Sequence, residues 1–203
     1  MIIYLPGWLN PAENLRPLAG FTGADFALID FPADAERTVA DMAEWVAGKI
    51  TEPVYIVGHS FGGKVAIATA ALYPEKVRGI FVIAGSNRGR LIFRLIRPAV
   101  KLAKWLGFSG ERFRGADYKN STEIMKKIMR HTLDFNIIPL ARRVACPATF
   151  IYGDRDTTTP PSLGKKLARQ IPGSKYFELA GFDHSTIITT GVYQASAIIK
   201  SRI

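Results

Sequence analysis

The chain has 203 residues, of which 48% are hydrophobic, 22% charged and 11% aromatic. This composition is typical of one globular domain and excludes a disordered, collagenous or repeat protein. A chain of this length buries about 70% of the surface that its unfolded form exposes, so its core needs no disulfide or metal. Cys146 is the single cysteine, which favours a reducing compartment.

The formal net charge is +10, from 27 Lys and Arg against 17 Asp and Glu. Such a balance favours acidic partners, namely nucleic acid, anionic lipid or an acidic carrier protein. Residues 88–130 hold twelve basic and three acidic side chains, which is +9 of the total. The charge therefore belongs to one segment, and the rest of the chain is close to neutral.

The start of the chain reaches the Pro6-Gly7 turn before a basic or a long apolar segment can form. No apolar run approaches the roughly twenty residues that a membrane span requires. We therefore expect no signal peptide and no transmembrane helix, and we predict a cytoplasmic location.

Short apolar runs alternate with longer amphipathic stretches, which predicts strands alternating with helices. The apolar runs are mostly continuous, as in parallel strands covered on both faces. Right-handed crossovers then give a doubly wound, three-layer α/β fold with a mostly parallel sheet of about six strands. The expected strands cover residues 2–5, 26–29, 54–57, 80–84, 148–152 and 175–179. The expected helices cover residues 11–19, 35–49, 61–73, 162–170 and 192–199. Asp34 and Thr38 are both available to cap the second helix.

One long segment interrupts this alternation. Residues 86–139 contain no convincing strand, and we expect helices there over residues 91–106, 111–117 and 121–132. An insertion of this kind in an α/β domain commonly forms a lid over the carboxyl ends of the strands. We predict a core of residues 1–85 and 140–203 and a helical cap of residues 86–139, inserted after the fourth strand.

The sharpest motif is Gly58-His59-Ser60-Phe61-Gly62, a G-x-S-x-G that follows an expected strand and opens an expected helix. The glycines are needed because the serine of such a motif sits on a tight, strained turn where side chains would collide with neighbouring elements. That turn exposes the serine hydroxyl. The alternative is a serine in a glycine-rich helix cap, which the strand before and the helix after argue against.

A nucleophilic serine needs a histidine as general base. The chain has three histidines. His59 lies inside the motif, and we interpret it as a pocket-wall or packing residue. His131 lies in the predicted cap, and we interpret it as a solvated or lid residue. His184 follows the last expected strand, in a loop able to reach Ser60, and is the predicted base.

The predicted acid is Asp156, in the loop after the strand at residues 148–152. Asp154 lies closer to the strand end, where it more plausibly caps a turn or pairs with the arginine that follows it. Asp183 is adjacent to His184, and neighbouring residues rarely orient each other's side chains. The order Ser60, Asp156, His184 is typical of one hydrolase arrangement and differs from the orders of the common serine proteases.

With these residues in this order, the chain resembles the α/β-hydrolase fold family over nearly its whole length. The matching parts are residues 58–62, residues 153–156 with Pro160 behind them, and His184. The resemblance implies a serine hydrolase that cleaves a carboxylic ester or thioester through an acyl-enzyme. No phosphate loop or metal-ligand spacing is present, so we expect neither cofactor nor metal.

The resemblance also implies an oxyanion hole built from the backbone N–H groups of Trp8 and Phe61. Pro6 stands where the family usually has a histidine before the glycine of this loop, and that removes a customary loop-ordering hydrogen bond but not the backbone donors. The chain starts directly at the strand that carries Gly7, so we expect the antiparallel hairpin that opens many family members to be missing.

The basic segment carries a possible partner-docking stripe, because five of its side chains recur at three- and four-residue steps of an expected helix. These residues are Arg90, Arg94, Arg97, Lys101 and Lys104. A solvated outer face of the cap is one interpretation, and docking on anionic lipid or on an acidic carrier protein are the others. Nucleic acid is disfavoured because no binding motif accompanies the charge.

The loop at Gly7-Trp8 and the arginine-rich cap together resemble the pimeloyl-carrier-protein methyl ester esterases, which are small members of the same fold. That resemblance implies an acyl substrate carried by an acidic protein. A member that binds a ligand and turns over slowly is a further alternative. The sequence leaves the oligomeric state open.

Overall fold

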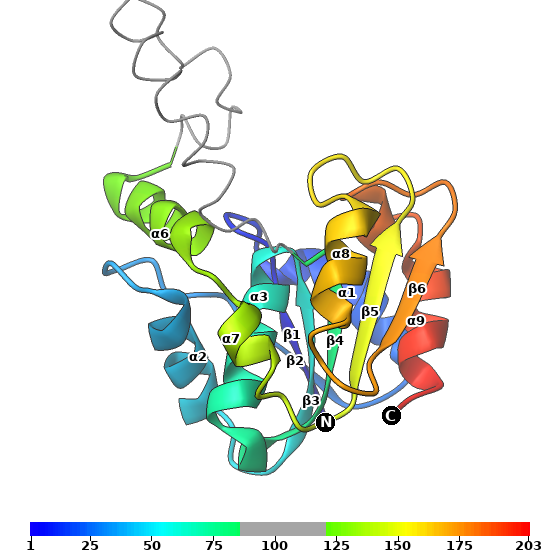
Figure 1. Ribbon diagram of the computed structural model, residues 1–203, viewed down its shortest axis with the longest axis horizontal. Helices are drawn as coiled ribbons and strands as arrows, with labels where there is room; N and C mark the ends of the chain where they lie inside the picture. Colours follow the sequence, from blue (N-terminus) through cyan, green and yellow to red (C-terminus); the bar gives the residue numbers. More distant parts are fainter. Residues whose placement is uncertain (86–120) are drawn as a thin grey trace, which may run out of the picture.

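The computed structural model describes residues 1–85 and 121–203, which build one six-stranded sheet (Figure 1). The strands are β1 (Ile2–Leu5), β2 (Phe26–Leu28), β3 (Val54–His59), β4 (Val77–Ile83), β5 (Ala148–Gly153) and β6 (Lys175–Leu179). Their order is β2-β1-β3-β4-β5-β6, and each neighbouring pair is parallel. The predicted parallel α/β sheet of about six strands is confirmed.

The central strands are buried on both faces, which explains their continuous apolar runs. All residues of β1 and β5 are buried, and so are all but one residue of β3 and of β4. The exposed residue in β4 is Arg78, and it divides the apolar run. For this reason β4 begins at Val77, three residues before the expected strand.

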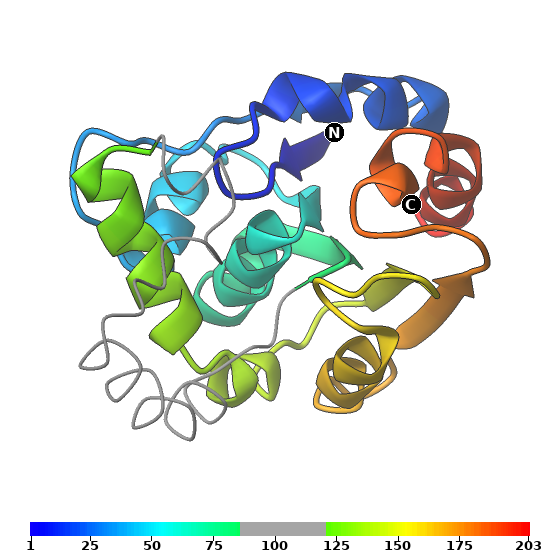
Figure 2. The same cartoon turned by 90° about the horizontal axis from the view of Figure 1, so that it is seen from above.

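Helices cover both faces of the sheet (Figure 2). They are α1 (Arg16–Thr22), α2 (Val39–Gly48), α3 (Phe61–Leu72), α6 (Glu123–Asp134), α7 (Ile138–Ala141), α8 (Pro161–Ala168) and α9 (Val192–Lys200). Short 3-10 turns are η1 (Ala12–Leu15), η2 (Pro74–Lys76) and η4 (Thr186–Ile188). Within the described ranges, no helix combines the length and the apolar character that crossing a bilayer needs.

Alternate residues of each strand feed two separate apolar layers. Ile2 and Tyr4 of β1 pack with residues of α1 and α9, whereas Ile3 and Leu5 pack with residues of α2 and α3. The helices α7 and α8 contribute to the second layer. The doubly covered sheet thus holds its strands rigidly, and the loops after their carboxyl ends gain a fixed support.

The second helix begins later than expected, at Val39. Thr38 caps it: the Thr38 hydroxyl accepts a hydrogen bond from the backbone N–H of Asp41, and the Asp41 carboxylate accepts one from the backbone N–H of Thr38. This reciprocal pair satisfies two backbone donors at once. Asp34, the other candidate cap, forms an ion pair with Arg37 instead.

The segment predicted as a cap is described only in its last part. Helix α6 matches the helix expected over residues 121–132, shifted by two residues, because Thr122 caps it through a hydrogen bond from the backbone N–H of Met125. The helices expected over residues 91–106 and 111–117 lie outside the described residues. Helix α7 crosses the predicted boundary at 139–140 and packs against α3.

Polar contacts from Lys64 and Glu36 join α6 to other parts of the described chain. The buried side chain of Lys64, on α3, donates a hydrogen bond of 2.7 Å from Nζ to the carbonyl of Thr132. Glu36, in the loop before α2, pairs with Lys127 at 3.0 Å and with His131 at 2.5 Å. His131 therefore faces another loop of the protein and is partly exposed.

Candidate active site

Ser60 lies on the tight turn between β3 and α3. Its backbone has φ 52° and ψ −109°, a conformation that non-glycine residues rarely adopt. The backbone N–H of Ser60 donates to the carbonyl of Ile83 at 2.9 Å, which anchors the turn to β4. A strained residue held in this way is typical of functional sites, where the surrounding structure fixes an unfavourable conformation.

The two glycines of the motif are required by close backbone approach. A Cβ on Gly58 would lie 2.3 Å from the carbonyl oxygen of Gly62, and a Cβ on Gly62 would lie 2.2 Å from the carbonyl oxygen of Leu5. Both distances are far shorter than a carbon–oxygen contact allows. The spacing of the motif therefore reflects the packing of this turn against the end of β1.

Three loops that follow β3, β5 and β6 bring Ser60, Asp156 and His184 together. His184 Nε2 lies 3.0 Å from Ser60 Oγ, and His184 Nδ1 lies 2.8 Å from Asp156 Oδ2. The imidazole thus bridges the hydroxyl and the carboxylate. Because parallel strands end at the same edge of the sheet, residues 124 positions apart meet here.

Asp156 has a fully buried side chain that is well supplied with donors. Burial by itself raises the pKa of this carboxyl group. Hydrogen bonds from His184, from the Thr159 hydroxyl and from the Thr159 backbone N–H outweigh burial, so the pKa of Asp156 lies below its ordinary value. The group is a carboxylate at neutral pH, and it can hold the Nδ1–H tautomer of His184.

Sequence reasoning missed Thr159. Its backbone N–H donates to Asp156 Oδ1 at 2.7 Å, and its hydroxyl lies 2.7 Å from Asp156 Oδ2 and 3.1 Å from His184 Nδ1. The hydroxyl also lies 2.9 Å from the carbonyl of Ala84. A threonine three residues after an aspartate is a turn pattern that the sequence does contain.

The two other carboxylates near the site stabilise loops. Asp154 Oδ1 accepts a hydrogen bond of 2.7 Å from the backbone N–H of Gly181, which ties the loops after β5 and β6 together. Asp183 Oδ1 accepts hydrogen bonds from the backbone N–H groups of Ser185 and Thr186 and from the Thr186 hydroxyl. Asp183 therefore holds the turn that carries His184 and does not bond to its ring.

His59 has a larger part in the site than packing. Its ring is buried, and Nε2 lies 3.0 Å from the backbone carbonyl of His184, which can only accept. Burial, and next the charge of His184, lower the pKa of His59 to about 4. The ring is neutral at pH 7 and carries its proton on Nε2. It links the turn that carries Ser60 directly to the backbone of His184.

The loop after β1 lies against the start of α3. The backbone N–H of Gly62 donates to the carbonyl of Pro6 at 3.0 Å. A Cβ on Gly7 would lie 3.6 Å from Ser60 Cβ, so this loop passes beside the serine. Trp8 from this loop and Phe61 from α3 line the same pocket.

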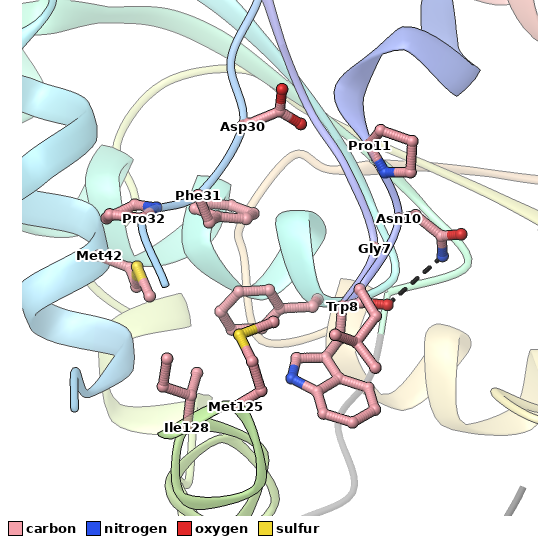
Figure 3. Close-up of a pocket in the computed structure, with 12 residues that line it drawn as sticks. Gly7, Trp8, Asn10, Pro11, Asp30, Phe31, Pro32, Met42, Met125 and Ile128 are labelled. Atoms are coloured by element: carbon pink, nitrogen blue, oxygen red, sulfur yellow. Dashed lines mark hydrogen bonds between the residues drawn. The ribbon is translucent and has the colours of Figure 1, made fainter. Parts of the chain in front are cut away.

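That pocket has a volume of about 280 Å³ and is shown in Figure 3. Its walls come from the loop after β1, from residues 30–32 after β2, and from α2, α3 and α6. The lining residues are Gly7, Trp8, Leu9, Asn10, Pro11, Asp30, Phe31, Pro32, Met42, Phe61, Met125 and Ile128.

Other predicted features are not brought into this site. The docking residues Arg90, Arg94, Arg97, Lys101 and Lys104 lie outside the described residues. Within residues 1–85 and 121–203, no three His, Cys, Asp or Glu side chains gather closely enough to hold a metal ion.

A family model described as the alpha/beta hydrolase family matches residues 2–187. A pimeloyl-[acyl-carrier protein] methyl ester esterase from Chromobacterium violaceum is 28% identical over 195 residues, covering 82% of this chain and 74% of that protein. The serine hydrolase BPHL from Homo sapiens is 29% identical over 157 residues, covering 72% of this chain and 54% of that protein.

The fold is also shared with solved structures. A hydrolase from Pseudomonas aeruginosa aligns with a TM-score of 0.76 over 100% of this chain and 89% of that chain, at 16% identity. The family model covers far more than half of the chain, and the order of the sheet and the G-x-S-x-G turn agree with it. The chain belongs to the alpha/beta hydrolase family.

Proposed function

We propose that this chain hydrolyses carboxylic esters, with Ser60 as nucleophile, His184 as general base and Asp156 as the group that orients His184. The proposal rests on the position of the His184 imidazole between the other two side chains. Its Nε2 lies 3.0 Å from Ser60 Oγ, and its Nδ1 lies 2.8 Å from Asp156 Oδ2. These are hydrogen-bond distances, and they leave Nε2 as the acceptor of the serine proton.

In the first step, Ser60 Oγ forms a bond to the ester carbonyl carbon while its proton moves to His184 Nε2. The imidazolium that results is stabilised by the adjacent carboxylate of Asp156, whose lowered pKa keeps it ionised. The carbonyl oxygen becomes an oxyanion. In this proposal the backbone N–H groups of Trp8 and Phe61 donate to it, and each such donor is worth about 3 kcal/mol in the chemical step.

In the second step, the bond from the carbonyl carbon to the leaving oxygen breaks, and His184 Nε2 returns the proton to that oxygen. An acyl-enzyme on Ser60 and a free alcohol result. Water then attacks the acyl carbon while His184 Nε2 takes one of its protons. The bond from the acyl carbon to Ser60 Oγ breaks, Nε2 returns the proton to Oγ, and the acid is released. A thioester reacts in the same way with a thiol as leaving group.

Labelling with a fluorophosphonate tests the nucleophile. The wild type should be modified at Ser60, and Ser60→Ala should lose labelling and more than about 10³-fold of kcat toward short esters. Ser185→Ala is a matched control, because that serine is exposed and lies beside His184 without touching its ring nitrogens. A Ser60→Ala protein that keeps wild-type esterase activity would overturn the mechanism.

Rapid-mixing kinetics distinguish an esterase from a slow-turnover binding protein. We expect steady turnover of short esters after the first acylation. A burst equal to the enzyme concentration, followed by negligible turnover on every ester, would favour a protein that binds its ligand and reacts once.

A finer proposal concerns the substrate. The relative from Chromobacterium violaceum is named for a methyl ester on an acyl carrier protein, and the segment 88–130 of this chain carries +9. These two observations support an acyl substrate presented by an acidic carrier protein, docked on Arg90, Arg94, Arg97, Lys101 and Lys104. An anionic lipid surface is the alternative partner for these five residues. The cytoplasmic location stays a prediction.

Salt dependence tests the carrier. Hydrolysis of a carrier-linked ester should fall steeply between low and high salt, while hydrolysis of the same ester free in solution should change little. Arg94→Glu should weaken only the carrier-linked reaction. Equal salt dependence of the two substrates would contradict carrier docking, and activation by anionic vesicles would support the lipid surface.

A further inference from the structure

The pocket that Gly7 and Phe61 line, next to Ser60, has mostly apolar walls. Met42, Phe61 and Ile128 are buried in it, and Trp8 and Phe31 are partly buried. Figure 3 shows the Trp8 indole, Met125 and Ile128 gathered on one side. At about 280 Å³ the pocket is slightly smaller than the roughly 300–1,000 Å³ of common ligand sites, which suits a short chain.

Asp30 is the single charged side chain among the described residues that line this pocket. In the view of Figure 3 it lies at the end opposite Met125 and Ile128, near Pro11. Its Oδ1 accepts a hydrogen bond of 2.6 Å from the backbone N–H of Ala12, which ties the loop after β2 to the turn η1. The loop is therefore fixed, and the carboxylate stays at the pocket.

We propose that the pocket binds the acyl chain of the ester and that Asp30 makes it select an apolar, uncharged chain over one that ends in a carboxylate. This inference rests on the proposed function, because it names the substrate class of the same site. Two physical effects act together. The wall residues from the described ranges 1–85 and 121–203 include no cation for a buried carboxylate, and Asp30 adds like-charge repulsion.

The size of the two effects differs. Asp30 is exposed, so solvent and salt screen its repulsion, and a charge at such a position changes rates by a modest factor. Desolvation by the apolar walls is independent of Asp30. Replacing Asp30 should therefore remove only part of the discrimination, and that part should shrink at high salt.

The test compares 4-nitrophenyl hexanoate with the 4-nitrophenyl monoester of adipic acid, which has the same chain length and a terminal carboxylate. The wild type should prefer the hexanoate at least about 10-fold in kcat/KM at low salt. Asp30→Asn should reduce this preference at least about 3-fold, chiefly by raising kcat/KM for the adipate monoester. The loop should keep its place, because the asparagine oxygen still accepts from Ala12 N–H.

Asp25→Asn is the matched control: Asp25 is exposed, lies just before β2 and does not line the pocket. It should leave the preference as in the wild type. Equal hydrolysis of both esters by the wild type, or a preference that Asp30→Asn does not alter, would overturn the inference. The proposed function fails if hydrolysis survives Ser60→Ala or if the wild type turns over neither ester, so the two failures are distinguishable.

Discussion

The two sides of the site are held in different ways. On the side of Asp156 and His184, short side chains bond to backbone groups only a few residues away, as Asp156 does with Thr159 and Asp183 with Thr186. On the side of α6, long side chains reach across the fold. Lys64 is 68 residues from Thr132, and Glu36 is 95 residues from His131.

This difference has a consequence for substitutions. Local turns next to rigid strands fix the reacting atoms, so changes there should act on kcat with little effect on folding. The contacts of α6 fix one wall of the pocket through single long side chains, so changes there should act on stability. The following predictions test this division.

The largest effect is expected for Asp156→Asn. The asparagine oxygen can still accept from the backbone N–H of Thr159, which turns the amide NH₂ toward His184 Nδ1. Nδ1 then has to accept, the proton moves to Nε2, and His184 no longer takes the proton of Ser60. We expect kcat to fall by about 10⁴-fold with unchanged folding, measured by steady-state kinetics and circular dichroism.

Asp183→Asn is the matched control for that variant. Its Oδ1 accepts three hydrogen bonds that an asparagine oxygen can also accept, and none comes from the imidazole. It should keep kcat within a few-fold of the wild type. If Asp183→Asn were the more damaging of the two, the assignment of the acid would be wrong.

A smaller effect is expected for His59→Phe, which keeps an aromatic ring but removes the donor to the His184 carbonyl. The backbone of His184 then loses one anchor, and a small displacement of a catalytic base costs about 10- to 100-fold in rate. We expect kcat to fall while KM stays unchanged. His59→Gln, whose amide can donate in the same direction, should recover part of the loss in kcat. An unaltered kcat in His59→Phe would contradict the role of His59 in positioning His184.

Lys64 allows a test of the α6 side through pH. Burial lowers the pKa of Lys64 from its ordinary 10.5 to about 8, so between these values the unfolded chain binds more protons than the folded one. The free energy of unfolding contributed by Lys64 therefore rises with pH across this window and is constant below it. Relative to Lys64→Met, the wild type should gain up to about 3 kcal/mol between pH 7 and 10.5.

Urea unfolding of both proteins at the two pH values measures this gain, since other titrations cancel in the difference. Lys166→Met serves as the control because Lys166 is exposed on α8. It should show no comparable change with pH. If the free energies of unfolding of the wild type and Lys64→Met differ by the same amount at both pH values, burial does not lower the pKa of Lys64 in the folded protein.

The fold was accessible from the sequence because buried parallel strands produce continuous apolar runs. Where a polar side chain enters a strand, as Arg78 does in β4, the expected boundary moves by three residues. For the start of α2, the sequence offered two candidate caps, Asp34 and Thr38, and did not decide between them. The reciprocal hydrogen bonds of Thr38 and Asp41 decide it, and their geometry is set by the entering loop.

The sequence by itself determined the parallel sheet, the strained serine turn and the candidates Ser60, Asp156 and His184, because each depends on local spacing next to a strand. Only the tertiary structure decided that His59 holds the His184 backbone, that Lys64 reaches α6 and that Asp30 lies at the pocket. These contacts join residues far apart in the chain. Spacing along the sequence carries no information about which distant loop a buried side chain will meet.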